Sequence, residues 1–140
     1  MKRNSLPAEG SFAGQPAAVW RPIIMLVEAN DDSRDLLRYL LEAQGYGVVL
    51  MQTAEQALRW LAFTQPDLIL LNIDNFPEDL SQLQQIQEQV ASQQVPILLT
   101  TADVETSFQW ELAEEGYGEV FVKPIEIEEL QQAVARHFPH

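Results

Sequence analysis

The chain has 140 residues, no cysteine and a formal net charge of −13. This length suits a single domain, and the missing cysteine excludes disulfides, thiolate zinc sites and thiol nucleophiles. Nucleic acid and acidic membranes bind clustered lysine and arginine, so we expect this acidic chain to have no nucleic-acid or membrane partner. No apolar run approaches the roughly 18 residues of a membrane helix. We therefore expect a soluble, cytoplasmic protein.

The first 22 residues mix Pro, Gly, Ser and Ala without an apolar period, which predicts a flexible N-terminal tail over residues 1–22. Apolar runs of strand length then alternate with helical patterns, and we predict one domain over residues 23–140. The first strand run is IIMLVE, residues 23–28. The helix after it begins at two acids, residues 31–32, and ends before Gly45, which is placed as a C-terminal cap.

The alternation repeats four more times. The later strand runs are GVVLM, DLILLNI, VPILLTT and EVFVK, and each of them is followed by a helical pattern. Three strand runs are almost unbroken apolar sequences, which is typical of strands that are covered on both faces. The pattern predicts an α/β fold, a doubly wound five-stranded parallel sheet with five helices.

Polar residues stand at the carboxyl ends of four predicted strands. Glu28 ends the first run and Asn72 the third, while Thr101 ends the fourth and Lys123 the fifth. In an open doubly wound sheet, ligands bind at this edge. Each residue alone has an ordinary structural explanation, but a lysine at the end of a buried strand has no packing reason. We therefore predict a functional site at this edge.

Five motifs carry these strand ends: LVEANDDSRDLL, GYGVVLMQTAEQALRWL, PDLILLNID, VPILLTTAD and FVKPIEIEELQQAV. They resemble the receiver domain of bacterial two-component response regulators, and the resemblance spans about residues 23–138. It implies the flavodoxin-like receiver fold and a role in phosphorelay signal transduction. In that family, two acids after the first strand bind Mg²⁺ and an aspartate after the third strand accepts a phosphoryl group. A threonine or serine and a lysine then bind that group.

Five positions of this sequence can be compared with that scheme. By position, Glu28 matches the first acid, whereas Ala29 replaces the second acid and Asn72 replaces the phosphoacceptor; Thr101 and Lys123 are retained. An amide oxygen is a poor nucleophile without negative charge, and Mg²⁺ prefers carboxylate oxygens. We therefore predict a degenerate pseudo-receiver that is not phosphorylated at Asn72, has no cofactor and binds Mg²⁺ weakly or not at all.

Two further expectations concern the same strand ends. Val120 stands three residues before Lys123, where the family usually has the tyrosine or phenylalanine of its switch, so the resemblance implies that this switch is missing too. We also expect Lys123 to pair with Glu28, with the Asn72 side chain bridging them. The remaining constellation would then be structural.

Two alternatives stay open. A displaced acid such as Asp74, two residues beyond Asn72, could accept the phosphoryl group instead. A small flavodoxin-like enzyme or flavin carrier is a remote alternative, because EANDDSR has two aspartates and no glycine where a phosphate-binding loop is needed. Both histidines, His137 and His140, lie in the last four residues. We predict that the protein is not an enzyme.

The expected partner is another protein. We expect a stand-alone module without an output domain, which contacts a sensor histidine kinase, another regulator or an output protein. Receivers commonly pair through the fourth helix, fifth strand and fifth helix, which makes residues 104–138 the candidate surface for a homodimer. Trp110 is a candidate interface residue, since it lies two residues from both Phe108 and Leu112 on the same predicted helix. Alternatively, its ring lies on the surface of its own domain.

Overall fold

The structure is a computed structural model that describes residues 21–74, 78–102 and 119–138. The strands are β2 (Ile23–Val27), β3 (Gly47–Met51), β4 (Leu68–Asn72), β5 (Ile97–Thr101) and β6 (Val120–Val122). The helices are α1 (Asp31–Ala43), α2 (Ala54–Leu61), α3 (Glu78–Val90) and α5 (Ile127–Arg136), with a short 3₁₀ turn η1 (Ala91–Gln93) after α3.

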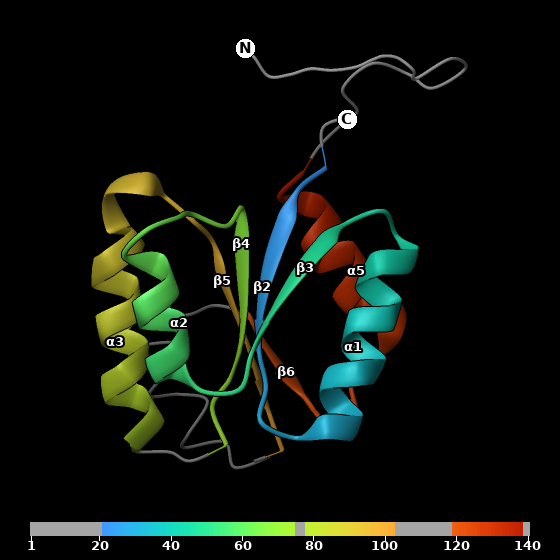
Figure 1. Ribbon diagram of the computed structural model, residues 1–140. Coiled ribbons are helices and arrows are strands. Elements are labelled where there is room, and N and C mark those ends of the chain that lie inside the picture. The colour runs from blue at the N-terminus through green and yellow to red at the C-terminus, as the bar shows by residue number, and fades with distance from the viewer. Residues whose placement is uncertain (1–20, 75–77, 103–118, 139–140) are drawn as a thin grey trace, which may run out of the picture.

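The five strands form one sheet in the order β3-β2-β4-β5-β6, and every neighbouring pair is parallel. Helices α1 and α5 cover one face of the sheet, and α2 and α3 cover the other (Figure 1). This arrangement confirms the predicted doubly wound α/β fold. Because all neighbouring strands are parallel, their carboxyl ends lie along one edge of the sheet.

Strand β4 shows why the central runs are apolar without a break. Leu68 and Leu70 belong to the core cluster that includes α1 and α5, while Ile69 and Leu71 belong to the cluster that includes α2 and α3. Successive side chains point to opposite faces of a strand, so a central strand covered on both faces buries all of them. This burial fixes the register of β4, and with it the position of the residues that follow.

The ends of α1 follow the predicted signals. Asn30 precedes the helix, and its Oδ1 accepts a hydrogen bond of 2.9 Å from the Ser33 N–H. Gly45 follows the helix with a φ of +97°, a left-handed conformation that glycine adopts without strain. The predicted C-terminal cap is therefore confirmed, and the cap lets the chain turn directly into β3.

Some predictions fall outside the described residues. The predicted tail over residues 1–22 does so except for its last two residues, and the helix expected around Phe108 and Leu112, with Trp110, does so entirely. The part of the chain that the structure describes contains four α-helices. No helix in that part has the length and apolar character needed to cross a lipid bilayer.

Candidate functional site

The four predicted site residues meet at one edge of the sheet. Glu28 follows β2, Asn72 ends β4, Thr101 ends β5 and Lys123 follows β6, and these four strands are consecutive in the sheet. The Lys123 N–H donates to the Thr101 carbonyl at 2.7 Å, which continues the pairing of β5 and β6 past the end of β6. The parallel register therefore brings together groups that lie far apart in the sequence.

Lys123 and Glu28 form the predicted ion pair. Nζ of Lys123 lies 2.8 Å from Oε1 of Glu28, and the Glu28 residue is only 2% exposed. The second carboxylate oxygen, Oε2, accepts the Asn30 N–H at 3.1 Å. The Arg34 guanidinium also donates to the Glu28 carbonyl at 3.2 Å, a contact that the sequence did not indicate. Both oxygens of this buried carboxylate are thus used by donors of the chain itself.

The Asn72 side chain does not bridge this pair, so that prediction was wrong. Its Nδ2 donates to Oδ2 of Asp74 at 2.9 Å and lies 3.3 Å from the Thr100 hydroxyl oxygen, while its Oδ1 accepts the Asp74 N–H at 3.2 Å. The reason is the alternation along the chain. Ile73 is buried in the core, which turns residues 72 and 74 toward the same side.

Asp74 lies at the centre of the site. Its Oδ1 accepts the Thr101 hydroxyl at 3.1 Å and the Ala102 N–H at 2.6 Å, and its Oδ2 lies 3.6 Å from Nζ of Lys123. Partial burial would by itself raise the pKa of this carboxyl. The hydrogen bonds from Ala102, Asn72 and Thr101 and the nearby Lys123 ammonium outweigh that effect, and the pKa of Asp74 is held below its usual value.

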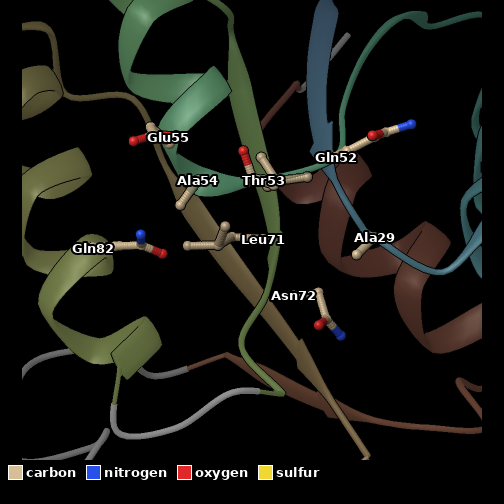
Figure 2. Close-up of a pocket in the computed structure, with 9 residues that line it drawn as sticks. Ala29, Gln52, Thr53, Ala54, Glu55, Leu71, Asn72 and Gln82 are labelled. Atoms are coloured by element: carbon tan, nitrogen blue, oxygen red, sulfur yellow. The ribbon is translucent and has the colours of Figure 1, made fainter.

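A cavity of about 290 Å³ adjoins Asn72 (Figure 2). Ala29 lines it from the chain segment that leaves β2, and the start of α2, at Ala54 and Glu55, lines it from above. At two of the positions where the family carries an acid, this cavity therefore meets the methyl group of Ala29 and the amide of Asn72. Among the described residues, no group of three or more histidine, aspartate or glutamate side chains is placed to hold a metal ion.

The two remaining candidates have different outcomes. Val120 begins β6, is half-buried and packs against the core cluster of α2 and α3. An aliphatic side chain therefore occupies this position at the sheet. Trp110 lies outside the described residues, so its role at an interface stays a prediction.

A doubly wound parallel sheet whose polar strand ends meet at one edge defines an α/β domain with its site at the sheet rim. The family is also identified: the chain matches the response regulator receiver domain over residues 24–135 and belongs to that family. It is thus a receiver domain of two-component signalling. The predicted resemblance is confirmed, and Asn72, Ala29, Thr101 and Lys123 can be compared with the positions that the family uses.

Known proteins agree with this assignment. A response regulator from Thermotoga maritima is 19% identical and superposes with a TM-score of 0.75, covering 84% of this chain and 98% of the other. The receiver domain of a sensor histidine kinase from Pseudomonas aeruginosa, solved with a magnesium ion coordinated in its active site cleft, is 26% identical with a TM-score of 0.72 and covers 84% and 97%. An uncharacterized 14.6 kDa protein of Leptolyngbya boryana is 26% identical over 116 residues, 81% of this chain and 88% of the relative.

Proposed function

We propose that this protein is a pseudo-receiver, a receiver-fold signalling module that is not phosphorylated at Asn72 and acts by protein–protein interaction. The observation that carries the proposal is the state of the residue at the end of β4. Asn72 is an amide whose nitrogen donates to Asp74 at 2.9 Å. An amide oxygen is uncharged and weakly nucleophilic, so it forms no acyl phosphate.

The proposal includes weak or absent Mg²⁺ binding. The family's metal site requires clustered carboxylate oxygens, because Mg²⁺ binds hard oxygen ligands in near-octahedral geometry. Glu28 is the acid retained there, and its carboxylate is already paired with Lys123 at 2.8 Å. Ala29 has no ligand atom in its side chain, and Asn72 brings no charge. The residues present do not fit a tight Mg²⁺ site.

Phosphorylation of Asp74 is the second candidate. It is favoured by one observation, the position of the Asp74 carboxylate between the Thr101 hydroxyl and the Lys123 ammonium. Against it, these two groups and the Ala102 N–H already bind the carboxylate itself. In a phosphorylated receiver the same donors must be free to neutralise the transferred phosphoryl group. We therefore favour an unphosphorylated site.

We propose that the partner is another protein, such as a sensor histidine kinase, another regulator or an output protein. The candidate contact surface, residues 104–138, is described from Glu119 onward, where it contains β6 and α5. A pull-down with the wild type and with Trp110→Ala tests this surface. Capture that is unchanged by a phosphodonor but lost in the variant is the expected result.

Magnesium titration by calorimetry tests the site directly. We expect no saturable binding in the millimolar range for the wild type. Asn72→Asp alone should remain a poor Mg²⁺ binder, because Ala29 still lacks a ligand, whereas Ala29→Asp/Asn72→Asp should bind measurably tighter. Micromolar binding by the wild type would overturn the proposal.

A further inference from the structure

Donors from three strand ends converge on the Asp74 carboxylate. Thr101 and Ala102 come from the end of β5, Asn72 from the end of β4 and Lys123 from the end of β6. One carboxylate oxygen, Oδ1, accepts hydrogen bonds from the Thr101 hydroxyl at 3.1 Å and from the Ala102 N–H at 2.6 Å. The other, Oδ2, takes Nδ2 of Asn72 at 2.9 Å and faces Nζ of Lys123 at 3.6 Å.

These contacts use most of the acceptor capacity of the carboxylate. An ionised carboxylate has two oxygens with about four acceptor positions, and Asp74 has two neighbouring donor groups at each oxygen. The Asp74 side chain nevertheless remains 36% exposed. A surface aspartate normally keeps water at several of these positions. Here a hydroxyl, a backbone N–H and an amide donate three hydrogen bonds to the carboxylate, and the Lys123 ammonium lies 3.6 Å away as an ion-pair partner.

We propose that the Asp74 carboxylate is a built-in occupant of an oxyanion site formed by Thr101, Ala102 and Lys123. It ties the ends of β4, β5 and β6 together without an external anion. The proposal deepens the proposed function and rests on it, because a site that took a phosphoryl group from outside could not keep this carboxylate among its donors. The site is suited to a small oxyanion, and the Asp74 carboxylate of the chain itself takes that place.

The charges at the site support an internal occupant. Lys123 lies between two carboxylates, 2.8 Å from Glu28 and 3.6 Å from Asp74. These three groups together carry one net negative charge. An additional phosphate would bring further negative charge to within a few ångströms of both carboxylates, where Coulomb repulsion is strong. Without the Asp74 carboxylate, the two remaining groups, Lys123 and Glu28, are neutral in sum, and the donors stay aimed at the emptied position.

Asn72 is matched to this arrangement. Its Nδ2 donates to the Asp74 carboxylate and its Oδ1 accepts the Asp74 N–H, so two hydrogen bonds hold residues 72 and 74 together. An aspartate at residue 72 would put a second carboxylate oxygen about 3 Å from Oδ2 of Asp74, and two carboxylates that close do not both stay ionised without added positive charge. The amide therefore orients Asp74 as well as removing the nucleophile.

Thermal unfolding in inorganic phosphate, compared with chloride at equal ionic strength, tests this inference. The wild type should melt at the same temperature in both salts. Asp74→Ala should be stabilised by phosphate, with a rise in melting temperature of roughly 3 °C or more at saturation, because the anion binds only the folded form. Asp74→Ala/Thr101→Val should lose most of that rise. If Asp74→Ala fails to fold, Asp74→Asn keeps the size of the side chain and serves in the same comparison.

The control is Glu88→Ala, which removes one exposed carboxylate from the C-terminal half of α3. It should show no phosphate effect. A phosphate effect of equal size in the wild type or in Glu88→Ala would overturn the internal occupant. The absence of a phosphate effect in every variant would overturn it as well. Tight Mg²⁺ binding by the wild type would instead overturn the proposed function, so the two failures are distinguishable.

Discussion

Replacing Lys123 by methionine should destabilise the fold strongly, because it leaves the Glu28 carboxylate buried without its counter-charge. Glu28 is 2% exposed and the Lys123 side chain is 19% exposed. Removing one partner of a buried ion pair costs roughly 3 to 5 kcal/mol. Since the lysine is not fully buried and the Asn30 N–H still binds the carboxylate, we take the lower end, about 3 kcal/mol. In a domain of this size that lowers the melting temperature by on the order of 10 °C.

Urea unfolding followed by circular dichroism measures this loss. The matched control is Arg38→Met, because the Arg38–Glu42 pair at 3.5 Å has both side chains about half exposed, and such a pair contributes at most about 1 kcal/mol. The double variant Glu28→Gln/Lys123→Met should recover part of the loss, with a coupling free energy of about 2 kcal/mol. A loss below about 1 kcal/mol for Lys123→Met would refute the reasoning, since the pair would then behave as an exposed one.

Three other substitutions test the local arguments. Thr53→Ala should cost about 1 kcal/mol in urea unfolding, because the Thr53 hydroxyl caps α2 by accepting the Gln56 N–H. Leu41→Ala should cost about 3 kcal/mol through the cavity it leaves in the core, since Leu41 lies on the buried face of α1. Asp74→Asn should be less stable than the wild type at neutral pH, and the difference should shrink as the pH falls below about 4. The folded-state pKa of Asp74 is lowered, so its contribution is present above its unfolded pKa and disappears as the carboxyl protonates; a difference that stays constant down to acid unfolding would contradict this.

The fold could be predicted because a strand that is buried on both faces of a sheet needs an unbroken run of apolar residues, which is visible in the sequence. Strand β4 buries Leu68, Leu70 and Leu71 together with Ile69, so an unbroken apolar run follows from its position. The Lys123–Glu28 pair could be predicted for a related reason. A charged residue at the end of a buried strand needs a partner, and parallel strands bring their carboxyl ends to one edge.

The role of Asp74 could not be read in the same way. It depends on how the chain turns after β4, which the sequence does not specify residue by residue. The sequence did place Asp74 two residues beyond Asn72, and hence on the same side, but it gave no sign of the Ala102 N–H, because every residue except proline has one. The expected bridge by Asn72 failed for the same reason: its amide finds Asp74 at 2.9 Å, while Lys123 contacts Glu28 directly.

Intact-mass measurement after incubation with acetyl phosphate and Mg²⁺ tests the central claim most directly. A receiver with its phosphoacceptor aspartate, treated in parallel, should gain one phosphoryl group and shows that the donor is active. We predict that the mass of the wild-type chain stays unchanged, because Asn72 has no nucleophilic carboxylate and Asp74 is held by its own donors. A wild-type adduct of one phosphoryl group, at Asp74 or at any other residue, would contradict the account.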